Sequence, residues 1–246
     1  MDTKTVSVKT TTAISMAIIL FFISHNNALA QAQNTPTLNN QNPNYNIKPG
    51  SWVRYTINGP SVQSDNKLLG LAMKGIVSNA FPFGNTTSLS FNDIEWIQRN
   101  ITGISRDNVT IQNVIKPYGK EPIIFKPVSW SLSDSTFHIL RKNVKIGEGS
   151  PSNSNSAFSP SLIVSRTVQK NIGGHNVAVY EVTGQRNSFN STSKLATQFT
   201  ITSYDDKVTG IPLQASFSFE LGAPLFGTVS ASLGFSAIDW SGRVGK

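Results

Sequence analysis

Two segments near the C-terminus alternate strictly between apolar and polar residues, and this pattern constrains the fold more than any other feature of the chain. In residues 211–221 the apolar positions are Ile211, Leu213, Ala215, Phe217, Phe219 and Leu221. In residues 229–237 they are Val229, Ala231, Leu233, Phe235 and Ala237. A period of two is typical of antiparallel strands that bury one face and expose the other. Long strands coil rather than stay flat, so we expect a strongly curved antiparallel sheet or a half-open β-barrel.

Shorter alternating segments at residues 53–57, 108–112 and 195–201 support the same class of fold. Charged residues make up only 14% of the chain, whereas Ser, Thr and Asn together approach a third of it, and this composition disfavours a helical bundle. Residues 134–145 fit a short helix and a strand about equally well. The sequence therefore predicts an all-β protein with at most one short helix.

The first 30 residues have the three parts of a secretory signal peptide. Lys4 and Lys9 give a positive start, residues 13–23 are apolar or small, and Ala28-Leu29-Ala30 is a cleavage site, so we expect cleavage after Ala30. An uncleaved membrane anchor is the alternative. The apolar run is shorter than the roughly 18–20 residues that cross a bilayer as a helix, so we predict no transmembrane span in the mature chain. We expect a protein that is secreted or held at the extracellular surface.

Polar stretches suggest how the mature chain is organised. Residues 31–46 hold almost no apolar side chains and are predicted to form a disordered tether. Residues 47–246 follow as a single antiparallel β domain, with a long polar loop predicted at residues 149–160.

Four Asn-x-Ser/Thr sequons, at Asn85, Asn100, Asn108 and Asn190, are candidate glycosylation sites. Such sequons carry glycans only on an exported chain, which fits the signal peptide. A chain this rich in Asn, Ser and Thr also produces sequons by chance, so both interpretations stay open.

Residues that usually carry catalysis or bind metals are sparse. The chain has no Cys, and His138 and His175 form no metal-binding pair. Ser64-Asp65-Asn66 and the Ser191–Lys194 segment match short motifs of penicillin-binding enzymes, but in the reverse order, so we interpret both as chance matches. We therefore expect a non-enzymatic protein that needs no metal or cofactor.

One acidic pair offers a weak enzymatic alternative. Asp93 and Glu95 are two residues apart and would share a face if both lay on one strand. Two carboxyl groups that flank a sugar can hydrolyse a glycosidic bond. A glycan hydrolase is therefore the weakest of our hypotheses.

Basic residues outnumber acidic residues by 21 to 13, which gives a formal net charge of +8. Outside the cell such a surface attracts lipid headgroups or an anionic polymer of the envelope, in a salt-dependent way. The export signal and the absence of nucleic-acid-binding motifs argue against a nucleic-acid partner. The oligomeric state stays open.

Large apolar residues from the alternating segments should meet on the concave face of a curved sheet. We predict that a ligand faces Phe199, Ile201, Phe217, Phe219 and Phe235. Our leading hypothesis is a binding or carrier module for an amphiphilic or anionic ligand of the cell envelope. The alternative is that these residues fill a closed core and that the protein is a structural or adhesive component of the envelope.

Five segments resemble, in the same order, parts of a family of exported β-proteins from ammonia-oxidising archaea. The segments are residues 47–55 (IKPGSWVRY), 96–111, 138–148 (HILRKNVKIGE), 166–182 and 204–211. This resemblance implies an exported β-protein and supplies no catalytic residues. The hairpin from Tyr204 to Leu213 is similar to one in lipoprotein carriers, which are half-open β-barrels around a lipid-binding cavity. That similarity covers about 15 residues and implies lipid binding.

Overall fold

Eleven antiparallel strands form one sheet in the computed structural model, which describes residues 45–78, 90–105, 108–132, 139–150, 160–191, 194–223 and 227–241. The strands are β1 (Trp52–Ser64), β2 (Ile94–Ile104), β3 (Asn108–Pro117), β4 (Ile123–Ile124), β5 (Val128–Ser131), β6 (Gly149–Ser150), β7 (Leu162–Ile172), β8 (His175–Asn190), β9 (Leu195–Asp206), β10 (Pro212–Ala223) and β11 (Gly227–Trp240). Their order is β4-β3-β2-β1-β11-β10-β9-β8-β7-β6, and β5 also pairs with β3.

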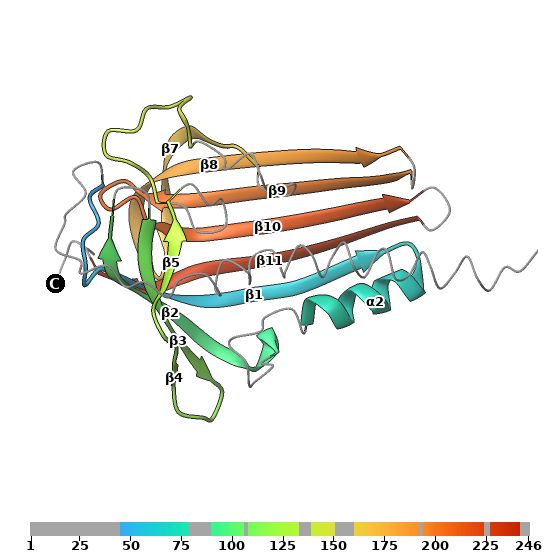
Figure 1. The fold of residues 1–246 in the computed structure, drawn as a ribbon, viewed down its shortest axis with the longest axis horizontal. Coiled ribbons are helices and arrows are strands. Elements are labelled where there is room, and N and C mark those ends of the chain that lie inside the picture. Colours follow the sequence, from blue (N-terminus) through green and yellow to red (C-terminus); the bar gives the residue numbers. More distant parts are fainter. Residues whose placement is uncertain are drawn as a thin grey trace, which may run out of the picture.

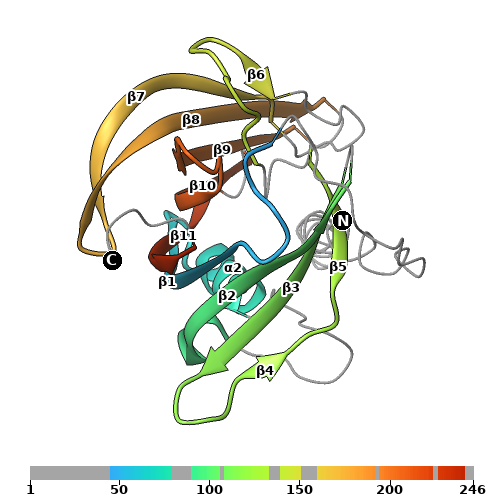
Figure 2. The same cartoon turned by 90° about the vertical axis from the view of Figure 1, so that its left-hand side faces the viewer.

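The sheet is strongly curved and is not closed into a barrel, which confirms the predicted fold class. Strands β8 to β11 and β1 run side by side along the length of the molecule (Figure 1). Seen end-on, the sheet has the outline of a C, and the helix α2 (Lys67–Ser78) lies on its concave side (Figure 2).

The two alternating segments near the C-terminus form β10 and β11, as predicted. Their register places Phe217 opposite Leu233 and Phe219 opposite Ala231, so apolar residues of the two strands share one face. Ser216 and Ser218 lie on the other face, opposite Gly234 and Ser232. This arrangement gives the sheet an apolar concave face and a polar convex face.

The turn between β7 and β8 closes one end of the molecule by folding back onto β11. Gly173 in this turn has a φ of +57°, and a Cβ atom there would lie 3.0 Å from the carbonyl oxygen of Ala237. The rings of His175 and Trp240 are 6.4 Å apart in an edge-on arrangement. The largest buried cluster lies at this end and includes Val53, Tyr55, Ile101, Val109, Ile111, Ile172, Val179, Ile211, Leu213 and Trp240.

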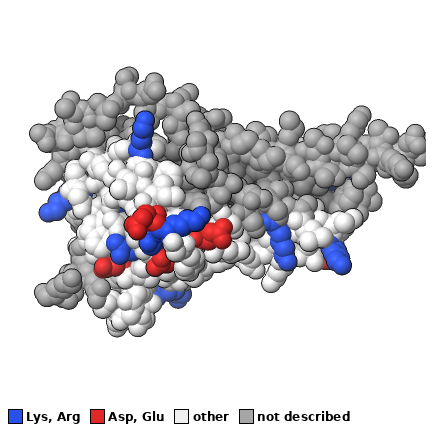
Figure 3. Space-filling model, turned by 90° about the horizontal axis from the view of Figure 1, so that it is seen from below, with Lys and Arg blue, Asp and Glu red and all other residues white. Residues whose placement is uncertain are grey.

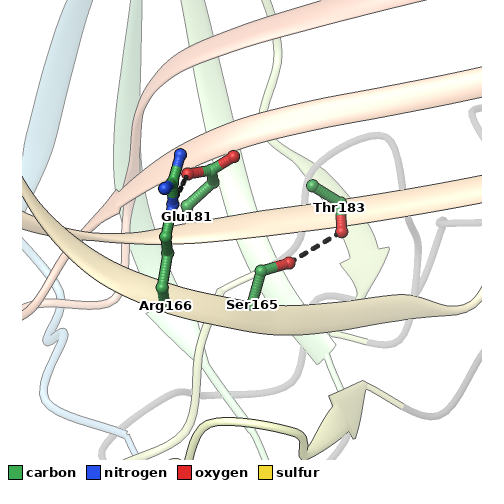
Figure 4. Close-up of polar contacts among 4 residues, drawn as sticks. All are labelled: Ser165, Arg166, Glu181 and Thr183. Carbon is green, nitrogen blue, oxygen red and sulfur yellow. Dashed lines mark hydrogen bonds and ion pairs between the residues drawn. The ribbon is translucent and has the colours of Figure 1, made fainter.

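An irregularity in the pairing of β7 with β8 directs two consecutive side chains of β7 toward β8 (Figure 4). Ser165 shares a hydrogen bond of 2.8 Å with Thr183, and the Nε atom of Arg166 lies 2.6 Å from a carboxylate oxygen of Glu181. A bulge inserts one residue into a strand and increases its twist. The irregularity therefore fits the point where β7 bends.

The α-helix among the described residues does not lie at residues 134–145. Residues 139–145, the described part of the possible helix at 134–145, form turns and irregular backbone and neither helix nor strand. The helix α2 instead follows β1. Its start is capped by Asn66, whose side-chain oxygen accepts hydrogen bonds from the backbone N–H groups of Leu68 (3.0 Å) and Leu69 (3.2 Å).

Several predicted segments agree with the structure only in part. Gly149 and Ser150 form β6 rather than loop, because they pair with the start of β7. Tyr45, near the end of the predicted tether, is buried in the largest cluster. The signal peptide with its cleavage site at Ala30, the tether up to residue 44, and residues 151–159 lie outside the described residues.

Candidate functional site

The five predicted ligand-facing residues lie on one face of neighbouring strands. Phe217 pairs with Ile201 across β10 and β9, and Phe219 pairs with Phe199. Phe235 on β11 pairs with Ala215, which lies two residues before Phe217 on β10. Directly opposite residues of an antiparallel pair point to the same side of the sheet. The predicted residues therefore come together on the concave face.

These five side chains differ in burial. Ile201 is fully buried and Phe199 is 5% exposed, whereas Phe217, Phe219 and Phe235 are only half-buried. The first two belong to one buried cluster with Leu140, Leu162, Val164 and Val182, and Phe217 and Phe219 pack against the edge of this cluster. Phe217, Phe219 and Phe235 lie on the concave face and keep part of their surface exposed. We therefore assign Phe199 and Ile201 to the core that supports the site, and Phe217, Phe219 and Phe235 to the candidate site itself.

A row of aromatic rings crosses the sheet from β10 to β1. The ring of Phe217 meets that of Phe235 at 5.9 Å, and Phe235 meets Tyr55 at 6.3 Å, both in edge-to-face geometry. This geometry is favourable for aromatic pairs and fixes the orientation of each ring. The guanidinium of Arg99 lies 5.9 Å from the centre of the Tyr55 ring. The aromatic row therefore ends at a cation.

Polar groups gather on the concave face beside the end of this row. Arg99 on β2 pairs with Val53 of β1 on one side and with Asn113 of β3 on the other, so all three share the face. Among the described residues, the buried side-chain oxygen of Asn113 has no hydrogen-bond partner. A buried polar atom without a partner is costly in a folded protein. An added donor at this place would therefore be stabilising.

Tyr55 is buried and lies at the centre of a cluster of polar residues that includes Arg99 and Asp205. Its hydroxyl donates a hydrogen bond of 2.6 Å to the backbone carbonyl of Pro212. Burial raises the pKa of Tyr55 far above its ordinary value; the positive charge of Arg99 lowers it, and Asp205 raises it further. The buried carboxylate of Asp205 accepts a short hydrogen bond from Ser203. Tyr55 therefore stays protonated and neutral beside Arg99.

A second cation lies on the apolar face. Arg186 on β8 pairs with Phe199 of β9, and Gly184, two residues before it, pairs with Ile201. Arg186 therefore lies on the same face as Phe199 and Ile201. Arg186 is half-buried. Long basic side chains can bury their stems on apolar surface while the guanidinium reaches a polar group. The concave face thus combines half-buried aromatic rings with two arginines.

Charged side chains outside this face do not form one basic patch in the view from below. Figure 3 shows acidic and basic side chains intermixed near the middle of that face, and further basic side chains toward both ends. Mixed charges at short spacing largely cancel each other beyond a Debye length of about 10 Å. In that view, the net charge of the chain does not mark out a binding surface.

The predicted glycosylation sites occupy different environments. Asn108 begins β3 and Asn190 ends β8, and both are exposed. Asn100 is half-buried within β2, and its side-chain oxygen accepts a hydrogen bond of 2.7 Å from Gln98. Asn85 lies outside the described residues. Exposure therefore favours Asn108 and Asn190 over Asn100.

The carboxylate pair considered for hydrolysis is not arranged as expected. Asp93 is the last residue of a short 3₁₀ turn, η1 (Phe91–Asp93), and only Glu95 lies on β2. The premise that both residues share one strand face is therefore wrong. Across the described ranges, no group of three or more His, Asp or Glu side chains could hold a metal ion.

Several residues of the site were not singled out from the sequence. Tyr55 was recognised only as part of an alternating strand, and Arg99 and Asn113 were not considered at all. From the sequence, Arg186 contributes only to the net charge. One signal was present: Arg99 continues the alternation of Ile97, so a strand prediction for β2 would have placed a charge on an apolar face.

Comparisons with known proteins add no family to this description: no family model matches the sequence, and no curated protein matches it. Among the residues that the structure describes, no helix is long and apolar enough to cross a membrane.

Proposed function

We propose that this chain is a non-enzymatic binding or carrier protein, exported from the cytoplasm, for an amphiphile with an anionic head group. The observation that carries the proposal is the aromatic row of Phe217, Phe235 and Tyr55 on the concave face, which ends at Arg99. The short similarity of the Tyr204–Leu213 hairpin to lipoprotein carriers agrees with this proposal.

The half-buried phenylalanines would contact the apolar tail. Each methylene group that leaves water for such a surface contributes about 0.8 kcal/mol, so a tail that covers Phe217, Phe219 and Phe235 would supply most of the affinity. Because edge-to-face contacts already hold the rings of Phe217 and Phe235, little side-chain entropy would be lost on binding.

The polar group would bind the head. The guanidinium of Arg99 matches a carboxylate or phosphate, which it can bind through two parallel hydrogen bonds. Tyr55 stays neutral and adds no negative charge, and the positive charge of Arg99 acts on Tyr55 more strongly than the carboxylate of Asp205 does.

A fluorescent fatty acid tests the tail-binding surface. We expect Phe217→Ala to weaken binding of this probe at least about fivefold, because the substitution removes a large apolar contact surface. Ser216→Ala is the matched control, since Ser216 neighbours Phe217 on the same strand but lies on the convex face. Equal affinities of the two variants would contradict the proposal.

The head-binding role of Arg99 is tested with the same chain length in two forms, a fatty acid and the corresponding alcohol. The native chain should prefer the acid, and Arg99→Gln should lose this preference while it keeps affinity for the alcohol. Arg166→Gln is the control, because the side chain of Arg166 on β7 is exposed and pairs with Glu181. A preference for the acid that survives Arg99→Gln would show that the head binds elsewhere.

A structural or adhesive role in the cell envelope is the second candidate, and the convex face favours it. Gln198, Ser216, Ser218 and Ser232 are exposed there, so hydroxyl and amide groups cover a broad surface with few charges. Such a face can form hydrogen bonds with an envelope polymer. Fractionation of cells tests this role: protein found only in the medium, and unchanged by salt washing of the cells, would contradict it.

A further inference from the structure

The helix α2 has two apolar sides, and only one of them packs against the sheet. Leu69 and Met73 face inward and contact a cluster that includes Phe219, Leu221 and Val229. Leu68 and Leu71 are 79% and 58% exposed. The fold therefore does not need these two leucines for its core.

Two lysines flank the exposed leucines. Lys67 and Lys74 are exposed and seven residues apart, which is about two helical turns, so they lie on the same side as Leu71. No acidic residue occurs within α2. The outer side of the helix, defined by Lys67, Leu68, Leu71 and Lys74, is therefore both apolar and positively charged.

We propose that the outer side of α2 docks onto the surface of an anionic lipid bilayer. Exposed leucines flanked by lysines are typical of helices that lie in the membrane interface, where the leucines enter the headgroup boundary and the lysines reach the phosphates. With 12 residues, α2 is about 18 Å long, so it lies on the bilayer and does not cross it. Charge complementarity selects anionic lipids.

Docking through α2 fixes how the sheet meets the membrane. The helix runs alongside the end of β1, so the long strands would lie along the bilayer (Figure 1). The inner side of α2 contacts Phe219, one of the proposed ligand-facing residues. One helix would thus touch both the bilayer and the concave face. This link rests on the proposed function, whereas docking itself does not.

Sedimentation with vesicles tests docking. The full chain is mixed with vesicles of phosphatidylcholine, either pure or with added phosphatidylglycerol. Because every variant keeps the apolar residues 13–23, any binding by that segment is the same in all of them. We expect the double variant Leu68→Ser, Leu71→Ser to bind both kinds of vesicle about tenfold more weakly than the native chain. The double variant Lys67→Gln, Lys74→Gln should lose about tenfold on the anionic vesicles only, with a weaker salt dependence.

The matched control is the double variant Ile124→Ser, Lys126→Gln. Ile124 on β4 is 67% exposed, and Lys126, two residues after it, is also exposed. Figure 1 shows β4 away from α2. The control should bind vesicles like the native chain. Equal binding by all variants, or an equal loss in the control, would overturn the proposal.

Two further measurements keep this proposal separate from the proposed function. Thermal unfolding should be the same for all variants, because every substituted side chain is exposed. Affinity for the fluorescent fatty acid should also be unchanged in the α2 variants. A native chain that binds vesicles but does not bind the fluorescent fatty acid would contradict the carrier role and leave the docking surface standing.

Discussion

Single backbone contacts hold the turn between β9 and β10 against the segment at residues 139–140. Gly210 has a φ of +74°, and its carbonyl accepts a hydrogen bond of 3.0 Å from the N–H group of Leu140. The carboxylate of Asp206 accepts hydrogen bonds from the N–H and the hydroxyl of Thr209, at 3.0 and 2.7 Å. Glycine is required here because a Cβ atom would overlap the backbone of Leu140.

We expect Gly210→Ala to lower the free energy of unfolding by about 3 kcal/mol, because left-handed strain and overlap with Leu140 act together. Gly119 provides the control: its φ is +65°, but nothing lies within 4 Å of an added Cβ atom. Gly119→Ala should cost only about 1 kcal/mol. Urea unfolding of both variants measures the difference, and equal costs would contradict the described contact.

The buried hydroxyl of Tyr55 predicts a pH dependence. Since burial raises its pKa, its contribution to stability is fully present below the ordinary tyrosine pKa near 10 and is lost as the pH rises above that value. Tyr55→Phe should lower stability by about 1–2 kcal/mol at neutral pH, because the carbonyl of Pro212 loses its donor.

The same variant should lose stability less steeply than the native chain in alkaline solution. Urea unfolding at several pH values between neutrality and pH about 11 measures both slopes. Parallel slopes would mean that Tyr55 ionises in the folded protein as easily as in the unfolded chain.

At the scale of elements, the turn between β7 and β8 matters because it joins two distant parts of the sheet. It lies against β11, although three strands separate β11 from β7 in the sheet order. Gly173 and Gly174 both have positive φ, but only Gly173 lies close to β11. Substitutions at Gly173 and Gly174 therefore separate the cost of local backbone strain from the cost of losing the contact with β11.

Gly173→Ala should destabilise the protein by about 2–3 kcal/mol, because its Cβ atom would press against the carbonyl groups of Ala237 and Ile238. Gly174→Ala meets no atom within 4 Å and should cost about 1 kcal/mol. Thermal unfolding compares the two variants. A larger effect at Gly174 would show that the turn does not contact β11 in solution.

The start of α2 gives a second prediction at this scale. Asn66→Ala removes the cap of the N–H groups of Leu68 and Leu69 and should destabilise the helix by about 1 kcal/mol. Hydrogen exchange should become faster in the first turn of α2 and stay unchanged in the middle of β9. An unchanged rate in α2 would mean that another group caps the helix.

At the scale of the whole molecule, the sequence predicts the strands better than their arrangement. The alternation in β10 and β11 is local, because each residue independently reports which face it occupies. The helix α2 was missed because apolar residues occur on both of its sides and obscure the helical period. From the sequence, its cap at Asn66 fits only the Ser64-Asp65-Asn66 motif, which we interpret as a chance match.

The sequence predicts the phenylalanines of the candidate site but not its polar residues, for a physical reason. Phe217, Phe219 and Phe235 lie on strands adjacent in sequence, so alternation alone places them together. Arg99 and Asn113 come from β2 and β3, and only the pairings of β11 with β1, β1 with β2 and β2 with β3 bring them to the same face. Pairings between distant strands depend on the entire sheet, and no local pattern encodes them.

The central claim is that the concave face binds an anionic amphiphile, and photo-crosslinking tests it most directly. The full chain is incubated with a fatty acid that carries a photoreactive group near the end of its tail, and the labelled residues are identified by mass spectrometry. We predict labels at Phe217, Phe219 or Phe235, and competition by unlabelled fatty acid. Labels on the convex face, such as at Ser216 or Ser218, or no labelling that competes, would contradict the claim.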